Sequence, residues 1–291
     1  MSAVAETARP LTPVFAAELP GIDLRRPFAA EDVVEAINRY AVLVFRHDRA
    51  LTDAEHLAFA RALGPLQRIK MLTMVGKSKT RLSSEYLIDV SNLDEQGRIF
   101  GASDRRRQFQ AGNRLWHTDV SFDTNRAVYS LLTAHVVPPG GADTEFADMR
   151  TAYDALPEAT KARIDGLEAE HSIWYSRALA GMTEVSEDEK ATRPSSRHPL
   201  VHVHPRSGRR ALYLASHISG IVGWPEAAGR ALVAELMAFA TQPRFVYRHQ
   251  WRVGDLVMWD NLATMHRATP FEDLAHPRDL RRATVLAAAD T

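Results

Sequence analysis

The chain has 291 residues, a quarter of them charged, with equal numbers of basic and acidic side chains and no cysteine. The balanced charge excludes the basic excess of a nucleic-acid-binding protein, and the missing cysteines exclude disulfides, thiolate nucleophiles and cysteine-based zinc or iron–sulfur sites. Because no apolar run approaches the roughly 18 residues of a membrane span and the N-terminus lacks a signal-peptide pattern, we expect a cytoplasmic protein without a membrane partner.

The N-terminal part predicts two helices separated by a buried strand. The segment AEDVVEAINRY has apolar residues at helical spacing, and the β-branched run Ala41–Phe45 that follows is typical of a buried strand. Thr52 and Glu55 have the spacing of a capping box at the start of a second helix, and Gly64 closes that helix.

Regular patterns fade from Arg68 to Arg114, where only YLIDVSNL indicates a short strand. Long connections inside a compact domain are usually functional or mobile, so we interpret residues 70–109 as an irregular, lid-like insertion. Residues 176–200 are expected to be irregular as well. No repeat at periods of 20 to 50 residues is present, and residues 1–291 are expected to form a single domain.

Strands are expected mainly in the middle and at the C-terminal end. The strand-like runs are AVYSLLTAHVV, TEFADM, RALYLASHISGI, FVYRHQW, DLVMWDNLATMH and RRATVLAA. Helical spacing is found in EAAGRALVAELMAFATQ and in DMRTAYDALPEATKARIDGLEAEHSI, the latter broken at Pro157. This order predicts a mainly β fold with flanking helices (α+β), in which the strands form a sandwich or a barrel.

The segment RLWHTDVSF places a histidine and an aspartate two residues apart among apolar residues. On a strand, His117 and Asp119 would point to the same face. Two imidazoles and one carboxylate on one side of an ion, with open positions opposite, select non-haem Fe(II) for oxygen chemistry. His266, just after DLVMWD, is the candidate third ligand. The alternative is a hydrogen-bonded polar pair in a turn, since the chain has 12 histidines.

Longer motifs around these residues carry a resemblance. LWHTDVSF, VVPPGGADTEFADMRTAYDALP and the pair GDLVMWDNLATMHR and RDLRRATVLA are similar to the Fe(II)- and 2-oxoglutarate-dependent dioxygenases of the taurine dioxygenase family, most of all to 2,4-dichlorophenoxyacetate dioxygenases. The similarity spans residues 12–288. It implies a double-stranded β-helix (jelly-roll) core and an enzyme that uses Fe(II), 2-oxoglutarate and O2, with ascorbate as a helpful additive in vitro.

The resemblance also implies roles for single residues. His117, Asp119 and His266 would bind the iron, and Thr144 and Arg278 would bind the distal carboxylate of 2-oxoglutarate. A guanidinium suits this carboxylate because it donates two parallel hydrogen bonds. Arg278 lies twelve positions after His266 where we expect eleven, so TPFEDLAHP carries one extra residue. The alternatives are a strand threonine and a surface arginine.

Substrate contacts are implied for three further residues. Arg282 matches an arginine that lies near the acid group of the substrate in similar enzymes. Lys70 and His217 lie where those enzymes have basic residues, and His204 is a weaker candidate of the same kind. The alternative for each histidine is a strand residue that hydrogen-bonds to the backbone.

The expected reaction is hydroxylation of an activated C–H bond in a small organic acid. For an aryloxyalkanoate this cleaves the ether to a phenol and glyoxylate, while 2-oxoglutarate becomes succinate and CO2. The alternative substrates are an alkylsulfonate or another small carboxylate, such as a natural-product intermediate. A binding protein without catalysis and a zinc hydrolase are alternatives from other classes. Members of the family often form homo-oligomers.

Overall fold

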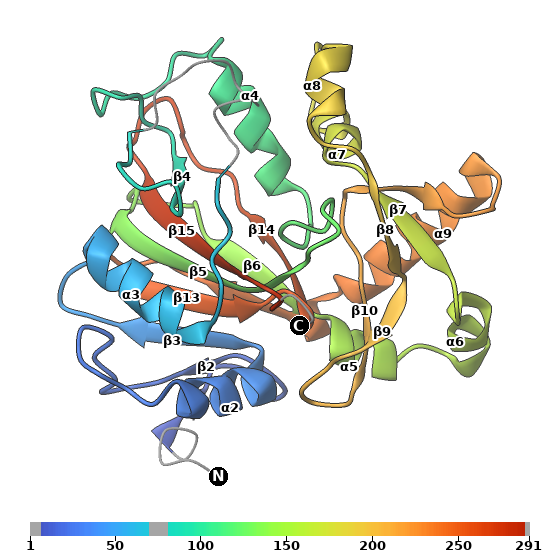
Figure 1. Cartoon of the computed structure of the whole chain (residues 1–291), viewed down its shortest axis with the longest axis horizontal. Coiled ribbons are helices and arrows are strands. Elements are labelled where there is room, and N and C mark those ends of the chain that lie inside the picture. The colour runs from blue at the N-terminus through green and yellow to red at the C-terminus, as the bar shows by residue number, and fades with distance from the viewer. Residues whose placement is uncertain (1–6, 70–80, 289–291) are drawn as a thin grey trace.

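A seven-stranded sheet and a three-stranded sheet form the centre of the molecule (Figure 1). The computed structural model describes residues 7–69 and 81–288, so the substrate contact expected at Lys70 lies outside the described residues. The larger sheet contains, in order, β1 (Arg9–Pro10), β2 (Ala17–Glu18), β3 (Val42–Arg46), β13 (Asp255–Asp260), β5 (Ala127–Val136), β15 (Asp279–Leu286) and β4 (Ile88–Ser91). The smaller sheet contains β12 (Val246–His249), β6 (Thr144–Asp148) and β14 (Thr264–Ala268).

Apolar side chains fill the space between these two sheets. Phe146 of β6 packs with Val257 and Trp259 of β13, and Leu132 of β5 and Leu280 of β15 belong to the same cluster. Most strand neighbours in these two sheets are far apart in sequence, and only the β2–β3 pair is parallel among the described pairings. The expected mainly β fold with a jelly-roll core is confirmed.

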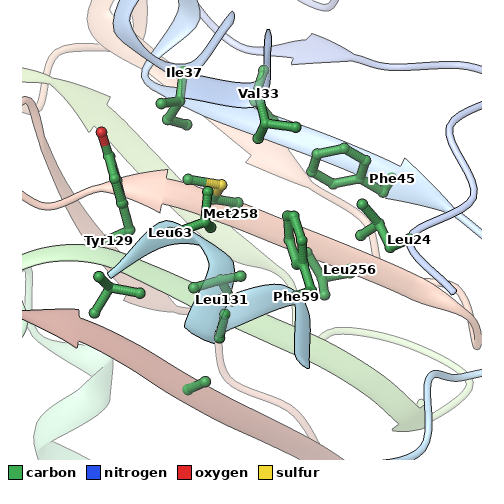
Figure 2. Close-up of a cluster of buried hydrophobic side chains, with 14 of the residues drawn as sticks. Leu24, Val33, Ile37, Phe45, Phe59, Leu63, Tyr129, Leu131, Leu256 and Met258 are labelled. Atoms are coloured by element: carbon green, nitrogen blue, oxygen red, sulfur yellow. The ribbon is translucent and has the colours of Figure 1, made fainter. Parts of the chain in front are cut away.

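Two helices cover the outer face of the larger sheet, α2 (Ala30–Tyr40) and α3 (Asp53–Leu63). Figure 2 shows Ile37 of α2 and Phe59 of α3 packed with Leu256 and Met258 of β13. The capping box expected before α3 is present. The Thr52 side chain accepts a hydrogen bond from the Glu55 backbone N–H, and the Glu55 side chain accepts one from the Thr52 backbone N–H. Among the residues that the structure describes, no helix is both long and apolar enough to cross a membrane.

The chain between β6 and β12 forms a second group of elements. It contains α5 (Met149–Asp154), α6 (Glu158–Ile164), β7 (Glu168–His171), α7 (Ile173–Leu179), α8 (Glu187–Ala191), β8 (Ser196–Pro199), β9 (Val201–Val203), β10 (Arg210–Leu212), β11 (Ile218–Ile221), α9 (Glu226–Ala240) and the short 3-10 helix η3 (Pro243–Phe245). Strands β11, β7 and β8 form one small sheet, and β10 and β9 form another. An apolar cluster joins α5 and α9 to these strands.

Several local expectations differ from the structure. The helical interpretation is wrong for residues 168–171, which form β7 between β11 and β8. Alanine and glutamate favour helices, but Ala169 and His171 alternate with more exposed neighbours, as in a strand. Residues 176–200 are not irregular throughout, because they contain the end of α7, α8 and β8. The described part of the insertion expected at 70–109 contains β4 and most of α4 (Arg105–Ala111), which leads into the 3-10 helix η2 (Gly112–Arg114).

Candidate metal centre and adjoining pockets

Two histidines are held together by the backbone. His266 lies in β14, and His117 forms an isolated antiparallel bridge with it. Each backbone N–H donates to the carbonyl of the other residue, at 2.9 and 2.8 Å. Residues opposite each other in such a pair present their side chains on the same face, and the imidazole centroids are 4.2 Å apart. The spacing of the two rings is therefore set by the fold.

Asp119 completes a group of three possible metal ligands. Ligand atoms of His117, Asp119 and His266 all lie within 4.8 Å of one another, and the three residues are buried. The expectation that Asp119 lies on a strand is wrong, because the chain turns directly after His117. Val120 has a φ of 58° in this turn, a left-handed conformation that is strained for a β-branched residue. The turn, rather than strand alternation, brings the carboxylate beside the imidazoles.

A network of hydrogen bonds fixes the orientation of the Asp119 carboxylate. Ser130 Oγ donates to Asp119 Oδ2 at 2.7 Å, and Asn261 Nδ2 donates to Ser130 Oγ at 2.9 Å. Trp259 Nε1 in turn donates to Asn261 Oδ1 at 3.1 Å. Arg282 donates to the other carboxylate oxygen, Oδ1. Partners of this kind orient a metal ligand and tune its basicity. The sequence motif WDN contains Asn261, but nothing in the motif predicted its hydrogen bond to Ser130.

The protonation states of the three side chains suit a divalent cation. Burial lowers the pKa of His117 to about 4 and that of His266 well below its usual value, so both imidazoles are neutral near pH 7. Burial raises the pKa of Asp119, but the Arg282 guanidinium and the imidazoles outweigh this effect and bring that pKa to about 2. Neutral imidazoles and an ionised carboxylate are the forms that bind metals.

The nitrogen atoms nearest the carboxylate are available as ligands. His117 Nδ1 lies 2.8 Å from the Leu115 carbonyl oxygen, to which it donates, and this bond leaves Nε2 as the acceptor. His117 Nε2 is 3.9 Å from Asp119 Oδ1, and His266 Nε2 is 3.7 Å from Asp119 Oδ2. A donor set of two imidazoles and one carboxylate is the set used for non-haem Fe(II). The residues present therefore fit this metal.

A small cavity beside the histidines contains Thr144 and Arg278. Arg278 is buried, and its Nη1 donates to the Val90 carbonyl at 3.1 Å. No carboxylate of the described residues pairs with it, and burial lowers the pKa of Arg278 to about 10, so it remains charged at neutral pH. The extra residue expected between His266 and Arg278 falls in the connection between β14 and β15, outside both strands.

A second cavity of about 100 Å³ borders His117 and Asp119 on another side. His217 and Arg282, both expected as substrate contacts, line it. His217 is buried, with its Nδ1 2.7 Å from Ser176 Oγ. His204 lies elsewhere, with its Nε2 2.8 Å from Asp260 Oδ2 and its Nδ1 accepting a hydrogen bond from the Ser207 backbone N–H at 3.1 Å. The apolar lining residues are Ile69, Ile88, Val90, Phe109, Val120, Phe122 and Ile173.

Two lining residues of this second cavity were missed by the sequence analysis. Arg177 and Arg193 border the cavity, although both fall in the segment 176–200 that was expected to be irregular. Their residue type gave no signal, because the chain has many arginines and most of them are on the surface. Ile88, Val90 and Phe109 belong to the insertion expected at 70–109, so this segment supplies part of the cavity wall. A closing motion of the segment stays a prediction.

The fold is a β sandwich in which two imidazoles and a carboxylate lie beside a cavity that holds an unpaired guanidinium. Together these features define a non-haem metal oxygenase. The chain belongs to the taurine catabolism dioxygenase TauD, TfdA family, whose model matches residues 7–284. It is 44% identical, over 96% of its length and 97% of the relative, to the alpha-ketoglutarate-dependent 2,4-dichlorophenoxyacetate dioxygenase of Cupriavidus pinatubonensis.

Two further comparisons agree. The chain is 36% identical to the (S)-phenoxypropionate/alpha-ketoglutarate-dioxygenase of Sphingobium herbicidovorans, over 90% of this chain and 89% of that protein. A crystal structure of AAD-2 in complex with Mn(II) and N-oxalylglycine superposes with a TM-score of 0.91 at 44% identity, covering 97% of each chain. The expected family and dioxygenase class are confirmed.

Proposed function

We propose that the chain is an Fe(II)- and 2-oxoglutarate-dependent oxygenase that cleaves the ether of aryloxyalkanoates. The observation that carries the proposal is the convergence of His117, Asp119 and His266 next to a cavity that contains Thr144 and Arg278. Bound iron would supply the activation of O2, by which 2-oxoglutarate becomes succinate and CO2 and one oxygen atom enters a substrate C–H bond. The likeness to a 2,4-dichlorophenoxyacetate dioxygenase supports the substrate class.

Thr144 and Arg278 would bind the cosubstrate. The Arg278 guanidinium has no counter-ion among the described residues, and the distal carboxylate of 2-oxoglutarate would supply one. Both residues border the same cavity as His117 and His266, so a dicarboxylate held there reaches the metal ligands with its other end. Their work is therefore to bind and orient the cosubstrate.

The second cavity would bind the organic acid. One part of its lining is apolar, and another part carries Arg177, Arg193 and Arg282. An aryloxyalkanoate has the same division, with an aromatic ring at one end and a carboxylate at the other. Arg282 and His217, for which the resemblance implies substrate contacts, also border this cavity.

The products follow from the position of the new hydroxyl group. Hydroxylation of an aryloxyacetate at the carbon between the ether oxygen and the carboxylate gives a hemiacetal. Its C–O bond to the aryl oxygen then breaks while the hydroxyl proton passes to that oxygen, which yields a phenol and glyoxylate. The enzyme need only hold the acid so that this carbon faces the metal ligands.

Anaerobic reconstitution with Fe(II) and 2-oxoglutarate, followed by O2 and a panel of acids, tests the proposal. The panel contains aryloxyacetates, aryloxypropionates and alkylsulfonates, with Asp119→Ala as the inactive control. We expect succinate and phenol in equal amounts with an aryloxyalkanoate. Succinate without phenol would move the substrate to an alkylsulfonate or another small carboxylate. No succinate from the iron-loaded protein would contradict the proposed activity.

We further propose that the enzyme works in the cytoplasm, which supplies 2-oxoglutarate, without nucleic-acid or membrane partners. The balanced charge of the chain supports the absence of a nucleic-acid partner. A homo-oligomer is proposed from the family alone, and light scattering coupled to size-exclusion chromatography measures it.

A further inference from the structure

Arg177 is a buried cation without an anion beside it. Arg177 is only 6% exposed, and its Nε is buried without a hydrogen-bond partner. Over residues 7–69 and 81–288 the guanidinium makes neither a hydrogen bond nor an ion pair with the protein. Arg150 is the opposite case, since it is also buried but pairs with Asp148 at 3.0 Å. A buried charge is normally paired, because leaving water without a partner is costly.

The surroundings of Arg177 hold its guanidinium at the second cavity. The side chain starts from α7 and lines this cavity together with His117 and Arg282. The Phe109 ring packs against it, with 4.2 Å between Arg177 Cζ and the ring centroid. On another side lies Gly112, where an added Cβ would be 2.0 Å from Arg177 Nη1. The absence of a side chain at position 112 is what leaves room for the guanidinium.

Arg282 does not remove the need for an anion near Arg177. Arg282 is already hydrogen-bonded to Asp119, which it partly neutralises. Burial lowers the pKa of Arg177 to about 10, and repulsion from Arg282 acts in the same direction, while Asp119 opposes both. Arg177 therefore stays charged at neutral pH and is the less compensated of the two cations.

We propose that Arg177 receives the acidic group of the substrate and thereby restricts the enzyme to anionic substrates. This inference rests on the proposed function and names a binding residue that the family resemblance did not supply. An acid bound at Arg177 occupies the cavity that His117 and Asp119 also border. Its ring would lie against the apolar cluster of Phe109 and Ile173, which are next to Arg177 in space.

The first test compares a charged ligand with its neutral analogue. Binding of 2,4-dichlorophenoxyacetate and of the corresponding amide is measured by calorimetry on anaerobic protein loaded with Fe(II) and 2-oxoglutarate. In Arg177→Met we expect the acid to bind roughly 100-fold more weakly, as for loss of one partner of a buried charge pair. We expect the affinity for the amide and for 2-oxoglutarate to stay within about twofold, and Arg177→Lys to recover part of the affinity for the acid.

A second variant, Gly112→Ala, keeps the positive charge of Arg177 but changes the position of its guanidinium. Gly112→Ala has a backbone conformation that alanine adopts without strain, φ −59°, but its methyl group displaces the guanidinium. We expect Gly112→Ala to weaken binding of the acid roughly tenfold and to leave the amide unaffected. If Arg177→Met does not fold, Gly112→Ala still tests the role of Arg177.

Thermal unfolding separates a binding role from a structural one. Arg177→Met removes an unpaired buried charge, so its Tm should equal or exceed that of the natural chain. Arg150→Met leaves Asp148 unpaired and should lower the Tm, which makes it the matched control. Equal loss of acid and amide binding in Arg177→Met, or a fall in Tm like that of Arg150→Met, would overturn the inference.

The proposed substrate and the role of Arg177 fail in different ways. If the natural chain binds an alkylsulfonate instead of aryloxyalkanoates, the aryloxyalkanoate proposal is wrong. The comparison of that sulfonate with its neutral sulfonamide then decides the role of Arg177, by the same loss in Arg177→Met. If the natural chain binds no organic anion of the panel, both proposals are overturned.

Discussion

Trp251 Nε1 donates a hydrogen bond of 3.0 Å to the hydroxyl oxygen of Thr144. Because the oxygen accepts this bond, the hydroxyl hydrogen is free to be donated to another group. The cavity shared by Thr144 and Arg278 is where the distal carboxylate of 2-oxoglutarate is proposed to bind. Trp251 therefore orients the hydroxyl toward its proposed ligand.

Replacement of Thr144 by valine tests this arrangement. Valine keeps the shape of the side chain but removes the donor, so we expect the KM for 2-oxoglutarate to rise roughly tenfold, as for a lost hydrogen bond to a charged group. The initial rate of succinate formation at saturating organic acid measures this KM. Thr144→Ser keeps the hydroxyl and should stay close to the natural chain. A rise in the KM for the organic acid alone would contradict the assignment.

Arg278 and Arg281 form a natural pair for a second test. Arg278 faces the cavity, whereas Arg281 pairs with Asp53 at 2.6 Å near the start of α3. We expect Arg278→Met to raise the KM for 2-oxoglutarate roughly 100-fold with little change in Tm. Arg281→Met should leave this KM unchanged. A large effect on this KM from Arg281→Met, with none from Arg278→Met, would contradict the assignment of Arg278.

Removal of the Ser130 hydroxyl should weaken metal binding. Ser130→Ala takes away the hydrogen bond to Asp119 Oδ2 and leaves Asn261 without its acceptor. We expect the affinity for Fe(II) to fall by roughly 10- to 100-fold, the usual effect of losing a group that orients a metal ligand. Anaerobic Fe(II) titration measures it. Thr133→Ala is the control, because Thr133 lies on the same strand but contacts His56. An unchanged affinity in Ser130→Ala would refute the role given to this network.

His56 should make the fold less stable in mild acid. It is buried, and burial lowers its pKa to about 4 in the folded protein, below the roughly 6.5 of an unfolded chain. As the pH falls from about 6.5 to about 4, the unfolded chain therefore takes up a proton that folded His56 does not, and stability is lost. One histidine accounts for up to about 1.4 kcal/mol per pH unit in this window.

Urea unfolding at about pH 7 and about pH 5 measures the effect. Other histidines, such as the buried His171 and the partly buried His202, act in the same direction, because desolvation also lowers their pKa values. The difference between the natural chain and His56→Gln isolates the contribution of His56. We expect a smaller loss of stability in His56→Gln, and an identical pH dependence in the two proteins would contradict the prediction.

Local signals predicted those parts of the fold whose cause is local. The capping box at Thr52 and the apolar runs of β5 and β13 depend on nearby residues, and they are where the sequence placed them. The strand β7 was missed because its alanine and glutamate favour a helix in isolation, while pairing with β11 and β8 decides its conformation.

The sequence likewise identified some residues of the site and missed others. Residue chemistry and the resemblance together identified His117, Asp119 and His266, yet the strand geometry assumed for Asp119 was replaced by a turn. Arg177 could not be identified from the sequence, because it was singled out by the lack of a partner for its guanidinium in the structure. The lack of a counter-ion and the room left by Gly112 are properties of the packed structure alone.

The connection between β14 and β15 is anchored to the rest of the fold by side-chain hydrogen bonds. Asn92 Nδ2 donates to the backbone carbonyls of Asp273 and His276 at 2.7 and 2.8 Å, which ties the connection to the end of β4. An added residue here leaves the strand registers, and hence the metal ligands, unchanged. Phe271 and Asp273 also line a cavity of about 240 Å³ that reaches Arg278. Insertions and deletions at this point would thus reshape the approach to the cosubstrate while the chemistry stays intact, which makes the connection a natural place to evolve or engineer access.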